Sequence, residues 1–99
     1  MIKGDVEMDA IKAGSVQFNH KAGNKAYNVG RIRHFAAVAA REKVDLLVFP
    51  EMCVTGYWHV RHLSKPDVER LAEPVPSGPT TQTLLSLSAE YEVTIGAGL

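Results

Sequence analysis

The strongest constraint on the fold is an apolar run in the middle of the chain that ends in a carboxylate. Residues 44–50 read VDLLVFP, and Glu51 follows directly. Continuous apolar residues are typical of a strand buried on both faces, as in parallel sheets that are covered by helices. Pro50 has no N–H to donate, so we expect sheet pairing to stop there. The run therefore predicts an α/β fold with Glu51 just beyond the end of a buried strand.

The flanking segments alternate between strand and helix patterns. Short stretches of small and β-branched residues predict three strands, over residues 11–18, 44–50 and 93–99. Apolar residues spaced by three and four predict two long helices and a short one, over residues 25–43, 80–91 and 64–71. The order strand, helix, strand, helix, helix, strand is typical of an α/β layered fold.

Polar residues mark the starts of two of these helices. Asn24 and Ser64 are residue types favoured at the N-cap, and Asp67 follows Ser64 by three positions. Residues 51–63 have no regular pattern, and we expect them to be irregular and rich in aromatic side chains. Gly56 lies in this segment, where we expect a tight backbone bend.

Composition narrows the class of protein. The chain has 99 residues, 45% hydrophobic and 22% charged, which favours one small globular domain. We expect residues 1–10 to be a flexible leader and residues 11–99 to form the domain. The formal net charge is zero without a long basic run, which argues against nucleic-acid binding. No apolar run approaches bilayer length, which argues against a membrane span.

The chain contains a single cysteine, Cys53. One cysteine cannot form an internal disulfide, which is compatible with a reducing compartment, and we expect a cytoplasmic location. Its position just after a buried strand favours a small thiol packed under the turn.

Glu51 is the first candidate for chemistry. Ligand sites of α/β sheets lie at the carboxyl ends of strands. A carboxylate emerging from an apolar run is expected to be partly desolvated, which suits it to proton transfer near neutral pH. From the pattern alone, a surface glutamate in a turn is an equal alternative.

The residues that follow Glu51 offer two weaker candidates. Tyr57 and Trp58 could rim a substrate pocket or form an aromatic cluster over the end of the sheet. His59 and His62 are spaced so that they could share a helix face. Two histidines are too few for a zinc site, which needs three or four ligands, so we expect no metal.

Four segments resemble the nitrilase superfamily of carbon–nitrogen hydrolases, in the family's order. The most specific is FPEMCVTGY at residues 49–57, which resembles the signature FPE-x-x-x-TGY. The other three are AGSVQFN at 13–19, NVGRIRHFAAVAAREKVDLLVFPE at 28–51 and PVPSGPTTQTLLSLSAEYEVTIGAGL at 74–99. The resemblance implies part of an α-β-β-α sandwich.

The resemblance also implies a reaction. Members of the family cleave a non-peptide carbon–nitrogen bond, in an amide, carbamoyl compound or nitrile, with a Glu-Lys-Cys set. Glu51 matches the family's glutamate, and Tyr57 and Trp58 fall where the family's substrate pocket is lined. The family uses no cofactor, and its members are expected to be homo-oligomers, usually dimers.

The resemblance covers only part of the catalytic set. The family's lysine and cysteine follow later strands, so neither Cys53 nor Lys65 matches them. We therefore expect an N-terminal portion of such an enzyme, inactive alone. The alternative is a non-catalytic α/β module that acts by self-association or partner binding.

Overall fold

A parallel three-stranded sheet forms the centre of the computed structural model, which describes residues 10–99. The strands are β1 (Ala13–Ser15), β2 (Leu46–Val48) and β3 (Thr94–Gly96), in the order β1-β2-β3. Gly14 pairs with Leu47, and Leu47 with Ile95. The predicted α/β fold is confirmed. The expected leader, residues 1–10, lies outside the described residues except for Ala10.

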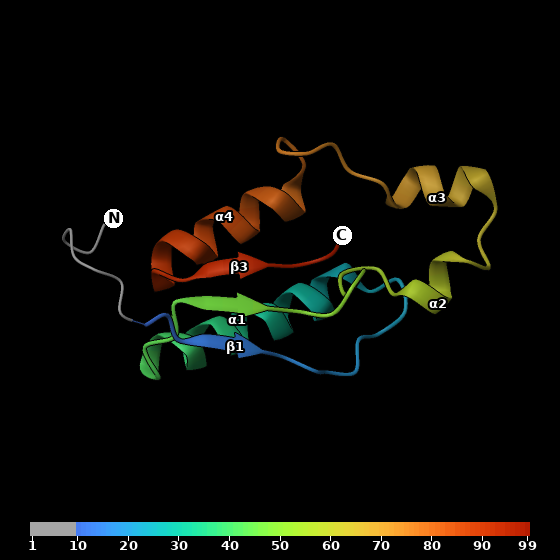
Figure 1. Ribbon diagram of the computed structural model, residues 1–99. Coiled ribbons are helices and arrows are strands. Elements are labelled where there is room, and N and C mark those ends of the chain that lie inside the picture. Colours follow the sequence, from blue (N-terminus) through green and yellow to red (C-terminus); the bar gives the residue numbers. More distant parts are fainter. Residues whose placement is uncertain (1–9) are drawn as a thin grey trace.

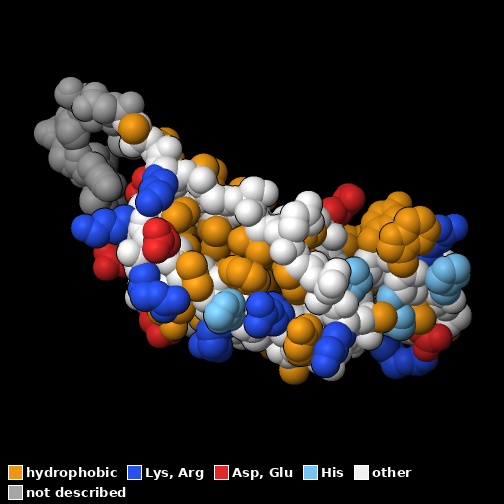
Figure 2. Space-filling model, turned by 90° about the horizontal axis from the view of Figure 1, so that it is seen from below, with side chains coloured by type: hydrophobic (Ala, Val, Ile, Leu, Met, Phe, Trp, Pro, Cys, Tyr) orange, Lys and Arg blue, Asp and Glu red, His pale blue; other side chains and the backbone are white. Residues whose placement is uncertain are grey.

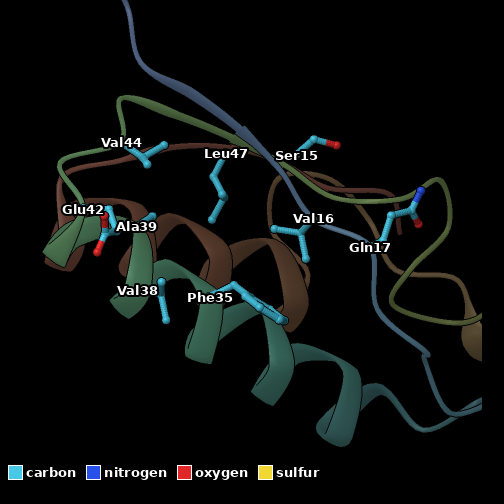
Figure 3. A pocket seen from close by; sticks show the side chains of 9 residues that line it. All are labelled: Ser15, Val16, Gln17, Phe35, Val38, Ala39, Glu42, Val44 and Leu47. Carbon is cyan, nitrogen blue, oxygen red and sulfur yellow. The ribbon is translucent and has the colours of Figure 1, made fainter.

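Four helices accompany the sheet: α1 (Lys25–Arg41), α2 (Tyr57–Val60), α3 (Lys65–Leu71) and α4 (Pro79–Tyr91). The two long ones, α1 and α4, pack against each other on one face of the sheet (Figures 1 and 3). Parallel crossovers of the same hand that advance in one direction place successive helices on one side. None of the helices described is long and apolar enough to cross a membrane.

Several predicted boundaries were wrong. Each strand has three residues, fewer than expected, and α1 ends at Arg41 rather than residue 43. Lys43 has a φ of +58°, outside helical geometry. The segment expected to be irregular contains α2, so the described chain has four helices where the sequence predicted three.

The expected burial of β2 on both faces was also wrong. Leu47 and Phe49 are buried in the core, but Val48 is 44% exposed. Figure 3 shows Leu47 directed toward α1. Because side chains alternate along a strand, Leu46 and Val48 lie on the opposite face. No described helix covers that face.

Both predicted N-caps are confirmed. The side chain of Asn24 accepts a hydrogen bond from the Tyr27 N–H, and that of Ser64 accepts one from the Asp67 N–H. Helix α4 has no capping side chain at Gly78. Instead, Glu73 accepts hydrogen bonds from the backbone N–H and the hydroxyl of Thr80, at 2.7 and 2.6 Å.

Glu73 also joins α4 to α1. Its carboxylate lies 2.6 Å from the Lys25 ammonium, which donates a second hydrogen bond to the Leu71 carbonyl. Burial alone would raise the pKa of Glu73, but the hydrogen bonds from Lys25 and Thr80 lower the pKa to about 2. The ionised carboxylate therefore stabilises the junction of the two helices.

Candidate active site

The candidate site lies at the end of the sheet where the strands finish. In a parallel sheet all carboxyl ends meet at one edge, and ligand sites form there. Figure 1 shows α2 and α3 beyond this edge, at the end of the molecule toward which the strands point. Glu51, Tyr57 and Trp58 all belong to segments at this end.

Glu51 begins a tight turn that runs from residue 51 to residue 55. The Gly56 N–H donates to the Met52 carbonyl at 2.8 Å, and Met52 adopts a left-handed φ of +50°. The side chain of Glu51 is exposed. We expected the Glu51 carboxylate to be partly desolvated, but within the described residues it is open to solvent. The buried apolar run ends before Glu51, and its side chain lies outside the core.

The extension of β3 holds one side of this turn. The Phe49 N–H donates to the Gly96 carbonyl at 2.8 Å, and the Val54 N–H donates to the Gly98 carbonyl at 3.2 Å. A Cβ atom on Gly98 would overlap the Met52 nitrogen and lie 3.1 Å from the carbonyl carbon of Glu51. Only glycine permits this approach of the two backbones.

The loop between β1 and α1 holds the other side. The Gly23 N–H donates to the Thr55 carbonyl at 2.9 Å. Asn28, in the first turns of α1, is fully buried and donates to the Val54 carbonyl at 2.8 Å. Sequence reasoning missed Asn28. The signal was available, because Asn28 lies one turn before the buried Ile32 on the same helix face.

The aromatic residues of α2 lie on the surface at this end. Tyr57 is 51% exposed and Trp58 is 64% exposed, and their rings meet edge to face at 5.9 Å between centroids. The guanidinium of Arg61 lies 4.7 Å from the centre of the Trp58 ring. Figure 2 shows hydrophobic and histidine side chains gathered at the end where α2 lies. These rings are therefore available to a ligand, but no described cavity is lined by them.

The expected bend at Gly56 is confirmed by a φ of +96°. A Cβ atom there would lie 2.6 Å from Nε2 of His20, and one on Gly23 would lie 2.8 Å from Nε2 of His59. The two glycines thus let two imidazoles pack against the backbone beside the turn. The described residues bring together no group of three or more side chains able to hold a metal ion.

Cys53 lies inside the turn and is 1% exposed. Burial is the largest influence on this thiol and raises its pKa. The thiol also donates to the Gly98 carbonyl, at 3.7 Å from Sγ. A buried thiol with a raised pKa is a poor nucleophile, because the thiolate is the reactive form.

One cavity lies beyond the carboxyl end of the sheet, and another lies beside β1. The first, of about 290 Å³, lies behind the Glu51 turn and includes Met52, Val54 and Thr55 in its lining, together with Lys25 and Glu73. The second, of about 300 Å³, lies between β1 and α1 (Figure 3). Glu51 lines neither. The three predicted site residues thus share one end of the sheet without forming one enclosed pocket.

These features agree with the comparison to known families. The chain belongs to the carbon–nitrogen hydrolase family, whose profile matches residues 12–99. A search of curated proteins found no significant match. The family match covers all three strands, all four helices and the turn that begins at Glu51.

Proposed function

We propose that this chain is the part of a carbon–nitrogen hydrolase that supplies the general base, and that Glu51 is that base. The observation that carries the proposal is the position of Glu51 at the carboxyl end of β2, in a turn fixed from two sides, within a segment matched by the family profile. A base must be held at a defined place to remove a proton from a nucleophile.

The nucleophile and the electrostatic stabiliser are proposed to come from residues other than these 99. Cys53 is the only cysteine in the sequence, and it is buried with a thiol whose pKa is raised. Lys25 is held by Glu73 and the Leu71 carbonyl. Lys65 lies on the exposed surface of α3. None of these side chains is suited to act with Glu51 on a carbonyl or nitrile carbon.

The proposed substrate is a small molecule with a non-peptide carbon–nitrogen bond, in an amide, a carbamoyl compound or a nitrile. In this scheme Glu51 accepts the proton of the attacking thiol and gives it to the substrate nitrogen, which leaves as ammonia or amine. The carboxylate then accepts a proton from the hydrolytic water. Tyr57 and Trp58, exposed on α2 beside the turn, are proposed to contact the substrate. We also propose that the complete enzyme is a homodimer and that it lies in the cytoplasm.

Ammonia release from a panel of amides, carbamoyl compounds and nitriles tests whether the 99-residue chain needs further residues for catalysis. We expect no turnover above buffer, and none in Glu51→Gln. Turnover that disappears in Glu51→Gln would show that these residues already contain a working catalytic set.

A non-catalytic role in self-association has one observation in its favour. The face of the sheet opposite α1 and α4 exposes Val48, which is 44% accessible, beside Ala13 and Leu46. An open apolar sheet face is a surface for association. This property is compatible with the enzyme proposal, since one protein can use both surfaces.

A further inference from the structure

We propose that Asn28 is a positioning residue for the Glu51 carboxylate, acting through the turn that carries it. This inference rests on the proposed role of Glu51 as the base. Asn28 lies in α1, 23 positions before Glu51 in the sequence. Asn28 contacts the backbone of the turn and not the Glu51 carboxylate. Asn28 would therefore act on the position of the carboxylate and not on the substrate.

The Asn28 side chain is held by three hydrogen bonds in the core. Its amide nitrogen donates to the carbonyls of Val54 and Lys21, at 2.8 and 2.9 Å. Its amide oxygen accepts from the Lys21 N–H at 2.8 Å. Both N–H groups of the amide are therefore used, and rotation of the side chain would break at least one bond. With no exposed surface, the side chain has no water to replace a lost partner.

These bonds join the loop after β1 to the turn after β2. Lys21 lies in the loop, and Val54 lies three residues after Glu51. Val54 is also held from β3, because its backbone N–H donates to the Gly98 carbonyl at 3.2 Å. Val54 is thus fixed from α1 on one side and from the β3 extension on the other.

The fixed turn leaves Glu51 little freedom except in its own side chain. The Gly56 N–H closes the turn on the Met52 carbonyl, and Gly98 packs against the peptide that joins Glu51 to Met52. A catalytic group is most effective when the surrounding structure holds it within a fraction of an ångström of the geometry that the reaction needs. Loss of the Asn28 bond to the Val54 carbonyl would remove the support that Val54 receives from α1.

Amide hydrogen exchange in Asn28→Ala tests this role in the 99-residue chain. The amides of Val54 and Gly56 report on the turn, and those of Val16 and Phe49 report on the sheet. We expect exchange at the turn amides to accelerate by roughly tenfold or more relative to the sheet amides, because a buried support is lost. We also expect the carboxyl carbon resonance of Glu51 to move.

Asn24→Ala is the matched control. Asn24 is the N-cap of the same helix, one turn earlier, and its side chain accepts a hydrogen bond from the Tyr27 N–H at 3.0 Å. Among the described residues, its side chain has no hydrogen bond to the turn. Its loss should destabilise α1 while leaving the ratio of turn to sheet exchange and the Glu51 resonance unchanged. A purely structural role for Asn28 would give the same result as this control, and that result would overturn the proposal.

Two further measurements cover the case in which Asn28→Ala does not fold. Asn28→Ser replaces the amide by a single hydroxyl, which can form a hydrogen bond, and is expected to show the same change in the exchange ratio to a smaller degree. In the unaltered chain, the Lys21 amide, bonded to Asn28, should open with the same free energy as the Val54 amide. Different opening free energies would contradict the proposed link. The exchange ratio does not depend on catalysis. A negative result for Asn28 can therefore be told apart from a negative result for Glu51 as the base.

Discussion

At the scale of residues, the roles of Glu51, Asn28 and Glu73 differ in how far the sequence could predict them. Glu51 was predicted from its place after an apolar run, whereas Asn28 and Glu73 were not. Their partners lie 26 and 48 positions away in the sequence, at Val54 and Lys25. Spacing within α1 can place Asn28 on the buried helix face, but it does not identify the partners of Asn28 or Glu73, because these contacts form only when the elements pack together. Local caps, such as Asn24 and Ser64, depend on near neighbours and were predictable.

The ion pair of Glu73 predicts a stability change at acid pH. Its pKa is about 2 in the folded chain, below the ordinary value of 4.5. A lowered pKa stabilises the fold above the ordinary value and loses this contribution as the pH falls toward the folded value. We expect Glu73→Gln to lower the free energy of unfolding at pH 7 by on the order of 2 kcal/mol.

Urea denaturation followed by circular dichroism between pH 7 and the acid limit of folding measures this effect. The difference between the original chain and Glu73→Gln should shrink as the pH falls from 4.5 toward 2. Glu69→Gln, at an exposed position on α3, is the control and should change stability little. A difference that is constant with pH would contradict the assignment of the ion pair.

At the scale of elements, the sequence predicted which segments are strands and long helices but not where they end. Val16, Phe49 and Val93 are buried core residues that lie outside the strands. Hydrophobic patterns report burial, whereas strand boundaries are set by hydrogen-bonded pairing, so the predicted strands were too long. Helix α2 was missed because it has four residues, no capping side chain and mostly aromatic or β-branched members. The exposed face of β2 was missed because a continuous apolar run does not show whether a covering layer is present.

The close approach of the β3 extension to the Glu51 turn predicts a strict need for glycine at position 98. A methyl group on Gly98 would overlap the Met52 backbone, so Gly98→Ala requires the two segments to separate. We expect this change to destabilise the chain by about 2 kcal/mol, as overpacking against backbone does. Thermal unfolding measures the loss.

Gly30→Ala is the matched control for this prediction. Gly30 lies within α1, and a Cβ atom there meets nothing within 4 Å. Alanine favours a helix over glycine by about 1 kcal/mol, so the control should raise the melting temperature. Equal effects of the two substitutions would contradict a specific contact between Gly98 and the turn.

At the scale of the whole molecule, helices cover one face of the sheet and leave the other open in the described residues. Six residues lie on the open face, and all are exposed or half-buried: Ala13, Ser15, Leu46, Val48, Thr94 and Gly96. The opposite face carries Leu47, packed against α1. The described chain is long and narrow, with extents of 50 × 26 × 18 Å, because α2 and α3 extend beyond the sheet (Figure 1). The molecule therefore has two distinct surfaces, a partly apolar open face of the sheet and the end that bears Glu51.

The open face predicts self-association of the 99-residue chain. Val48→Lys places a charge in the middle of this face and should shift the chain toward monomer in sedimentation velocity at concentrations of about 100 μM. Leu85→Lys is the control, because Leu85 is 54% exposed on α4, away from the sheet face. Association that is lost equally in both variants, or in neither, would exclude the sheet face as the contact.

The central claim is that Glu51 is the base of a carbon–nitrogen hydrolase, and steady-state hydrolysis by the natural gene product that contains this segment tests it most directly. We predict that Glu51→Gln lowers kcat by roughly a factor of 1,000, within the range of general-base catalysis, with an unchanged melting temperature. Glu90→Gln, at an exposed position on α4, should retain full activity. Activity of Glu51→Gln within a few fold of the original enzyme would contradict the claim.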